Sequence, residues 1–326
     1  MIELKNDQLI FRFPDVHEEA VCRINFQRTL RIPDDNREYP LPPGLGSFSL
    51  NMVDDYSDKV SEDWRKHGGV FLPMHQAEAT WLSFSSRYPM AVKVAAGKID
   101  ALTGENWKNT LTTSPQNYLI IPDQPWLDGF CVQKGLIRQF VAMPLGEGYT
   151  AEEQITGEAQ HGGVQIMVYP MKAKIYNKYR KRQREVSKYS INNSVVNLEM
   201  GLAPGGLMRQ EIYEDRYGFD AWEHSVNSRC FVHIVDSLQI FGITGSEPSR
   251  KPPTAKQYTN AGLPWFEYYD ADQKALEGAK KLAGLDSVAA KKIKKGEGVL
   301  TENEPVSPEL VRKLGKGKRV VREGEF

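Results

Sequence analysis

Histidine is the side chain best suited to acid–base or metal chemistry near neutral pH, and two of the six histidines in this chain occur in the same short string. The string His-Gly-Gly-Val stands at residues 67–70 and again at residues 161–164. Each copy leads into an apolar run that closes on Pro-Met. If a pseudo-twofold axis related the copies, His67 and His161 would occupy equivalent corners and could share a metal ion or a substrate.

His75 follows His67 by eight residues and is a candidate third nitrogen ligand. Zinc and non-haem iron sites use three or four such groups, held about 2 Å from the ion and often joined by one carboxylate. Glu153 and Glu158 are acids close to the second copy. The sequence therefore offers His67, His75 and His161 as metal ligands or acid–base groups, with Glu153 or Glu158 as the acid.

Lys172 stands where a histidine equivalent to His75 would be expected in the second copy, so this ligand set is not symmetric. The glycine-rich segments 146–148 and 201–206 have neither the GK[ST] nor the GxGxxG ending of a nucleotide-binding loop. A divalent metal is thus the only cofactor that the residues suggest.

The repeated string also has an explanation that needs no ligand. Glycine in the left-handed conformation closes a helix without a Cβ penalty, and a histidine in the last helical turn interacts favourably with the helix dipole. We therefore expect a short helix to end at each His-Gly-Gly and to pass into a strand. The sequence leaves this interpretation and the chemical one open.

Other landmarks recur with the string, notably Ile-Pro-Asp at residues 32–34 and 121–123, and a spacing of about ninety residues indicates a duplicated unit. Most of this part alternates polar and apolar residues or is rich in β-formers. We predict a first β unit over residues 1–88 and a second over 89–171. Together they would form one mainly β domain, a duplicated β-barrel or β-sandwich with short helices, in a chain that is α+β overall.

The composition changes after this β domain. Basic residues dominate from Lys172, so residues 172–190 are predicted to be a linker. Residues 191–326 are predicted to form a smaller mixed α/β region that packs on the β domain and ends in helices. The glycine- and lysine-rich tail from about residue 315 is expected to be disordered.

Composition excludes several function classes. Lys and Arg together number 42, as do Asp and Glu, so no overall charge draws the chain to nucleic acid or to a membrane. Three scattered cysteines without a CxxC motif argue against a disulfide framework and against a thiolate zinc site. The chain also shows neither a secretory signal nor an apolar run long enough to span a bilayer. We expect a soluble cytoplasmic protein.

Two further patterns suggest partners. Lys178, Arg180, Lys181 and Arg182 lie among tyrosines and could follow a phosphate backbone, although most charge runs are solvated helix or linker faces. Aromatic residues that could anchor a protein partner or a second copy of the chain are Trp126, Trp265, Phe266 and Tyr268. Alternatively, the segment that contains Trp265, Phe266 and Tyr268 packs back over the β core.

The leading functional hypothesis is a non-catalytic β-scaffold that binds a partner or a ligand and can self-associate. The rival is an enzyme, metal-dependent in one version, whose centre lies at the junction of the two units. The two hypotheses differ on whether the purified protein carries a stoichiometric metal ion that is lost when His67 and His161 are replaced by Ala.

Overall fold

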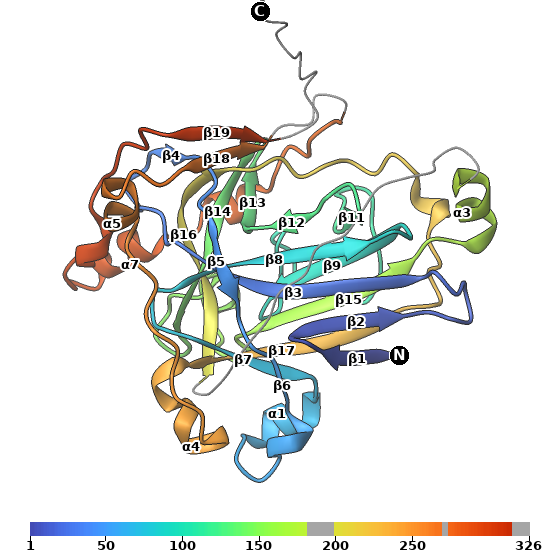
Figure 1. Cartoon of the computed structure of the whole chain (residues 1–326), viewed down its shortest axis with the longest axis horizontal. Coiled ribbons are helices and arrows are strands. Elements are labelled where there is room, and N and C mark those ends of the chain that lie inside the picture. The colour runs from blue at the N-terminus through green and yellow to red at the C-terminus, as the bar shows by residue number, and fades with distance from the viewer. Residues whose placement is uncertain (181–198, 269–272, 315–326) are drawn as a thin grey trace, which may run out of the picture.

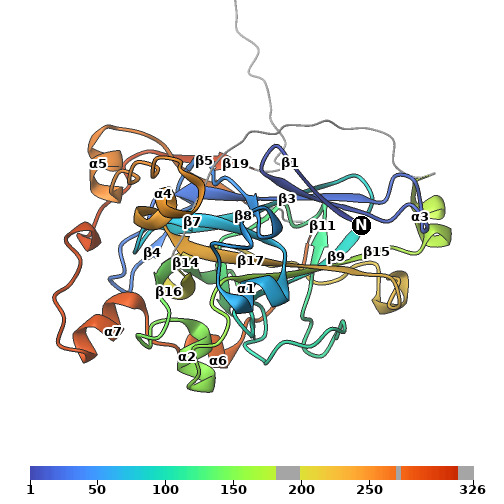
Figure 2. The ribbon, with the colours of Figure 1, turned by 90° about the horizontal axis from the view of Figure 1, so that it is seen from below.

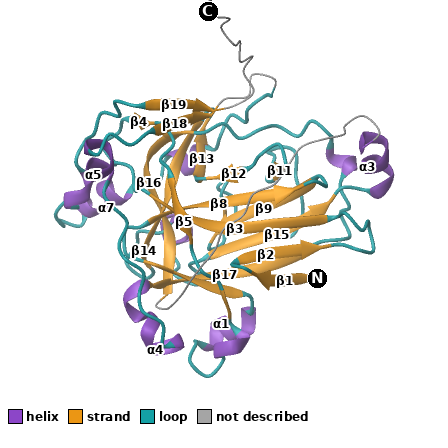
Figure 3. Cartoon of the chain, viewed as in Figure 1, coloured by secondary structure: helices purple, strands orange, loops and turns teal. Residues whose placement is uncertain are grey.

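The protein is mainly β. The computed structural model describes residues 1–180, 199–268 and 273–314, with 38% of the chain in strands and 18% in helices. Figure 3 shows the strands filling the centre of the molecule and the short helices at its margins. The predicted mainly β class with short helices is confirmed.

Most strands belong to one large open sheet whose pairings are mainly antiparallel. Its strands are β1 (Ile2–Lys5), β2 (Gln8–Arg12), β3 (Val21–Thr29), β4 (Glu38–Tyr39), β5 (Gly44–Ser47), β6 (Asn51–Met52), β7 (Val70–Met74), β8 (Ala79–Ser86), β9 (Met90–Ala96), β10 (Ile99–Asp100), β11 (Leu119–Ile121), β12 (Trp126–Leu127), β13 (Gly129–Gln133), β14 (Leu136–Pro144), β15 (Val164–Pro170), β16 (Glu199–Arg209) and β17 (Ser228–Asp236). Two more strands, β18 (Trp265–Tyr268) and β19 (Val311–Leu314), form a separate parallel pair.

Strands far apart in the sequence are neighbours in this sheet. The path of pairings runs β1–β2–β3–β8–β14–β16–β17–β15–β9, and β7 adds to the other side of β17 in parallel. In Figure 1, β3, β8, β9 and β15 cross the middle of the molecule, while β14 and β16 run steeply to them. Since β17 lies between β15 and β7, it joins the parts of the chain that carry the two His-Gly-Gly-Val strings.

The middle of the sheet is buried on both faces. Every residue of β9 and β15 is buried, and both strands are almost continuously apolar, as strands covered on two sides must be. Strand β3 instead alternates at its start, with Cys22 and Ile24 inside and Arg23 outside. One continuous core cluster extends from the first strands to the C-terminal region.

Short helices cover the margins of the sheet (Figures 1 and 2). The α-helices are α1 (Glu62–His67), α2 (Ala151–Thr156), α3 (Ala173–Arg180), α4 (Ile240–Thr244), α5 (Ala255–Asn260), α6 (Lys280–Ala283) and α7 (Val288–Lys294). The 3₁₀ turns are η1 (Asp54–Tyr56), η2 (Phe219–Ala221), η3 (Ser237–Gln239) and η4 (Thr301–Asn303). A capping box formed by Thr150 and Glu153 starts α2.

The start of the predicted basic linker is helical. Residues Ala173–Arg180 form α3, whose Tyr176 is buried against Tyr88, with ring centroids 4.0 Å apart. Residues 181–190 of that prediction, and the predicted disordered tail from 315, lie outside the described residues. Packing of Tyr176 gives the basic segment a buried face that its composition did not reveal.

The C-terminal region attaches to the Ile-Pro-Asp turn at residues 32–34. The backbone N–H of Asp34 donates to Oδ1 of Asn303 at 2.6 Å, and Nδ2 of Asn303 donates back to the Asp34 carbonyl at 3.1 Å. The Asp34 carboxylate accepts a third bond from the N–H of Ala289 at 2.9 Å. The turn therefore serves as a polar anchor for α7 and η4.

The prediction that this region ends in helices is wrong for the described residues, because the last described element is β19. Its residues Val311–Leu314 pair in parallel with β18, and β18 in turn bridges to the main sheet through Leu41 and Phe266. A strand partner supplied by the fold outweighs local helix preference in so short a segment.

Trp265 anchors the C-terminal region to the main sheet, and its substitution tests this role. Its side chain is fully buried, with its ring centroid 6.3 Å from that of Tyr39. We expect Trp265→Ala to lower the free energy of unfolding by about 3–5 kcal/mol, since the deletion leaves a large cavity. Urea denaturation measures the change. The control Phe241→Ala removes an exposed ring and should cost about 0.5 kcal/mol or less; equal effects would contradict the proposed packing role.

Candidate functional site

The two His-Gly-Gly-Val strings meet at strand β17. Val70 and Val164 both pair with Val232, one from each side of that strand. From this point β7 runs parallel to β17 toward Asp236, whereas β15 runs antiparallel to it toward Ser228. The two His-Gly-Gly corners, residues 67–69 and 161–163, therefore approach the same short stretch of β17 from opposite flanks.

Glycine is required in both corners by contact with β17. Gly69 and Gly163 have φ of 85° and 50°, in the left-handed region that favours glycine. A Cβ on Gly69 would overlap the carbonyl oxygen of Phe231, and one on Gly163 would lie 2.6 Å from the carbonyl oxygen of Val232. Backbone geometry thus accounts for the glycines of the repeated string.

A helix ends at the string only in the first copy. Helix α1 ends at His67, and the N–H of Gly68 donates to the Trp64 carbonyl at 2.8 Å. Helix α2 ends at Thr156 instead and is closed by Gly157 in the left-handed conformation. The expectation of a helix end at each His-Gly-Gly is therefore wrong for the second copy, where residues 158–160 intervene.

The side chains of His67 and His161 converge. Their ring centroids are 4.9 Å apart and the rings meet edge to face at 85°. Nδ1 of His67 lies 2.7 Å from the carbonyl oxygen of Asp63. Because a carbonyl only accepts, Nδ1 carries the proton and Nε2 carries the lone pair. Among the described residues, neither His67 Nε2 nor a ring nitrogen of His161 has a hydrogen-bond partner.

A third imidazole lies beneath this pair. The ring of His233 stacks on Trp64 of α1 with centroids 4.5 Å apart, and it lies 6.5 Å from the ring of His67. Its Nε2 donates to the Gly68 carbonyl at 3.0 Å. Burial is the main cause that lowers the pKa of His233 to about 4; the two neighbouring imidazoles act in the same direction, and the bond to Gly68 opposes them. His233 is therefore neutral at pH 7.

His161 is also held in its neutral form. Burial lowers the pKa of His161, and electrostatic interactions with His67 and Lys98 act in the same direction, against a smaller opposing effect of Asp63. The three rings line one shallow hollow together with Trp64 and Phe231. The polar part of the hollow comes from Asp63, Gln160 and Gln165.

Glu153 and Glu158, the acids predicted from the sequence to act at the site, have structural roles instead. Oε1 of Glu153 accepts the N–H groups of Gly146 and Gly148, and its Oε2 closes the capping box. Glu158 is 55% exposed and pairs with Lys98 at 3.5 Å. Both carboxylates are therefore engaged at the surface of their own loops.

The acid that does touch the site is Glu152, which sequence reasoning missed. Its carboxylate is buried and accepts the backbone N–H groups of His161 at 3.2 Å and of Gly162 at 3.1 Å. Burial raises the pKa of Glu152 despite these bonds. Glu152 thus holds the second corner in place; the capping-box spacing from Thr150 marks Glu153, and no sequence pattern marks Glu152.

His75 does not join the other histidines. It is buried, and its Nε2 lies 2.6 Å from the carbonyl oxygen of Ser249. Its backbone N–H donates to Glu78, which pairs with Arg28 at 2.6 Å. No group of three or more His, Cys, Asp or Glu in the described part of the chain is arranged to hold a metal. The predicted set of His67, His75 and His161 is therefore not assembled.

The cysteines are unsuited to nucleophilic chemistry. Cys22, Cys131 and Cys230 are free and buried. Burial raises the pKa of each thiol to about 12, so the thiolate is scarce at neutral pH.

The predicted partner-binding aromatics fall into two groups. Trp265 is fully buried and Phe266 packs on the core, so both belong to the attachment of the C-terminal region. Trp126 and Tyr268 contact each other with ring centroids 4.8 Å apart and line a second shallow depression. Phe266, Trp126 and Tyr268 are each partly buried, and of these three only Trp126 and Tyr268 line the depression.

The basic residues proposed for nucleic acid are only partly described. Lys178 and Arg180 lie in α3, where Arg180 pairs with Glu19 at 3.0 Å. Lys181 and Arg182 lie outside the described residues.

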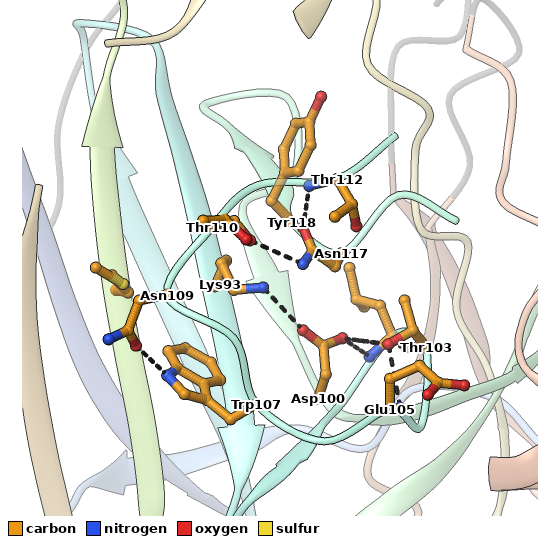
Figure 4. Close-up of polar contacts among 12 residues, drawn as sticks. Lys93, Asp100, Thr103, Glu105, Trp107, Asn109, Thr110, Thr112, Asn117 and Tyr118 are labelled. Carbon is orange, nitrogen blue, oxygen red and sulfur yellow. Dashed lines mark hydrogen bonds and ion pairs between the residues drawn. The ribbon is translucent and has the colours of Figure 1, made fainter. Parts of the chain in front are cut away.

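A buried ion pair of Lys93 and Asp100 is the other prominent polar cluster (Figure 4). The two groups are 3.3 Å apart with side chains 1% and 3% exposed, and Lys93 lies over the Trp107 ring. Asp100 also accepts three bonds from Leu102 and Thr103. All these contacts are internal, which indicates that the pair orders the loop after β10.

Comparisons with known proteins give no guide to this site. No family model matches the chain, and no match is found among curated proteins or among solved structures. Within the described residues, no helix has the length and apolarity needed to cross a membrane. Functional inference therefore depends on the geometry alone.

Two effects make glycine necessary at residue 69: its left-handed backbone conformation and its contact with β17. Their contributions to stability can be measured separately. Gly157 has a φ of 75° and open space around its Cα, so Gly157→Ala should cost about 1–2 kcal/mol of unfolding free energy. Gly69→Ala adds an overlap with the Phe231 carbonyl and should cost several kcal/mol more. Chemical denaturation measures both losses. Equal losses of unfolding free energy in the two variants would contradict the steric role of the Gly69 contact.

His233 should make stability depend on pH. Its folded pKa of about 4 lies below the unfolded value of 6.5, so the unfolded state binds more protons between these values. The stabilisation is complete above pH 6.5 and is lost as the pH falls toward 4, amounting to about 3 kcal/mol. We expect His233→Gln, which can still donate to Gly68, to show a correspondingly smaller loss between pH 7.5 and 4.5 in urea titrations. An unchanged pH dependence would refute the assignment.

Proposed function

We propose that the protein is a non-catalytic β-scaffold that binds a ligand or a partner at the hollow between the two His-Gly-Gly corners. The observation that carries the proposal is the contact of His67 and His161, 4.9 Å apart between ring centroids, with ring nitrogens that the described residues leave unbonded. Such nitrogens can donate to or accept from a ligand. The aromatic surface of Trp64 and Phe231 beside them supplies apolar contact.

Binding is favoured over catalysis by the roles of the neighbouring reactive groups. Glu152 and Glu153 are engaged with backbone N–H groups, and the three thiols are buried. Both corners are also tightly held, which suits recognition of a ligand by a preformed surface. Self-association and binding of a protein partner at the Trp126 and Tyr268 depression are compatible with the same scaffold role.

The second candidate is an enzyme, and it rests on His161. A neutral imidazole with an unbonded nitrogen at a hollow is suited to act as a general base, a role that contributes about 10²–10⁴ in rate. In this version the catalytic centre lies at the junction of the two units.

The proposal also covers the arrangement of the β domain. We propose that residues 1–88 and 89–171 are duplicated halves of one barrel-like or sandwich-like β domain. Support comes from β7 and β15, which start opposite Val232 on its two sides and run in opposite directions. A pseudo-twofold axis near Val232 would relate two such strands.

The proposal is tested with a library of water-soluble fragments that carry carboxylate, amide or hydroxyl groups. We expect saturation-transfer NMR on chelator-treated protein to find fragments that bind the wild type but lose most of their signal with His67→Phe/His161→Phe. Phenylalanine keeps the ring packing and removes the nitrogens. The matched control His224→Phe changes an exposed histidine that packs on Phe219.

Fragment binding that is equal in all variants, or no binding at all, would reject the hollow as the site. Turnover of a bound ester or amide fragment that His161→Phe abolishes would replace the scaffold hypothesis by the enzyme hypothesis.

A further inference from the structure

The spacing of the two imidazoles matches that of two ligands on one ion. Imidazole nitrogen binds zinc at about 2.0–2.1 Å, and the ring centroid lies about 1.1 Å behind the nitrogen, so each centroid is about 3.2 Å from the ion. At a tetrahedral angle, two such centroids are about 5 Å apart. The rings of His67 and His161 have centroids 4.9 Å apart and planes at 85°.

The surroundings of His67 are those of a metal ligand. A histidine that binds a metal usually donates its other ring N–H to a carbonyl or carboxylate, which fixes the tautomer and the ring. Nδ1 of His67 makes this bond to the Asp63 carbonyl at 2.7 Å and leaves Nε2 as the ligand atom. Asp63 itself lines the hollow.

Hydrogen bonds of the backbone fix the position of His161. Its N–H and that of Gly162 both donate to the buried carboxylate of Glu152, so the residue has little freedom to withdraw from His67.

We propose that the hollow binds one divalent transition-metal ion through Nε2 of His67 and a ring nitrogen of His161. This inference rests on the proposed binding function and specifies its ligand class. Imidazole favours Cu²⁺, Ni²⁺ and Zn²⁺ over the oxygen-preferring Mg²⁺ and Ca²⁺. His75 takes no part, since its Nε2 is bonded to Ser249 elsewhere in the fold.

A site with two protein ligands leaves coordination positions for water or for an exogenous ligand. In the described residues no third His, Cys, Asp or Glu completes the set. His233 instead donates its Nε2–H to Gly68 and supports the corner from below. The ion is therefore exchangeable, and Cu²⁺ should bind more tightly than Ni²⁺ or Zn²⁺.

The test is metal titration of the full chain after chelator treatment. Calorimetry in a non-coordinating buffer at pH 7.5 should show one Cu²⁺ per chain, with weaker Ni²⁺ and Zn²⁺ binding and none of Mg²⁺. We expect His67→Phe and His161→Phe each to weaken Cu²⁺ at least tenfold and His224→Phe to leave it unchanged. The Cu²⁺ electron paramagnetic resonance spectrum should show coupling to two nitrogens in the wild type and to one in each site variant.

Circular dichroism and thermal melting establish that each variant is folded. Unchanged Cu²⁺ affinity in both folded site variants, or no stoichiometric binding by the wild type, would overturn the metal site. Fragment binding at the hollow combined with no stoichiometric Cu²⁺ binding would leave the scaffold proposal standing while the metal site fails. If metal binding depends on both histidines but no fragment binds, the metal site is supported and the proposal that the hollow binds organic ligands is rejected.

Discussion

The close approach of two glycine corners to the backbone of β17 is the constraint on which this structure depends. Gly69 lies against the Phe231 carbonyl, and Gly163 lies against the Val232 carbonyl one residue farther on. Strands β7 and β15 can add to opposite sides of β17 only because neither corner carries a Cβ there. The positions of His67 and His161 follow from this arrangement, since each precedes its glycines directly.

The sequence identified the repeated string but not how its copies are oriented. Strand-forming residues are local signals, and the mainly β class that they predicted is confirmed. Pairing partners are not local. Nothing in the string shows that β7 runs parallel to β17 while β15 runs antiparallel to it. The error at β19 has the same origin, because that strand exists through its pairing with β18.

Within the site, the sequence revealed the two histidines that recur and missed the groups that support them. His233 bonds to a carbonyl 165 residues away, and as a single histidine within an apolar strand it gave no signal. Glu152 lies beside Glu153 on α2, and only burial distinguishes the acid that holds the second corner. His75 follows His67 closely in sequence, yet the chain turns away along β7 and carries it to Ser249.

Because both corners are fixed to β17, the separation of His67 and His161 is set by strand register rather than by loop motion. The carbonyls of Gly69 and Gly163 also accept bonds from Val53 and Gly97, each at 3.0 Å, so each corner is tied on a second side. A ligand that bridges the imidazoles would therefore order few additional groups on binding. The same rigidity restricts the choice of ligand: the rings can close on an ion or a small polar group, whereas a larger bridging ligand would require one corner to leave β17. The hollow is thus more selective for size than an equivalent pair of histidines on free loops.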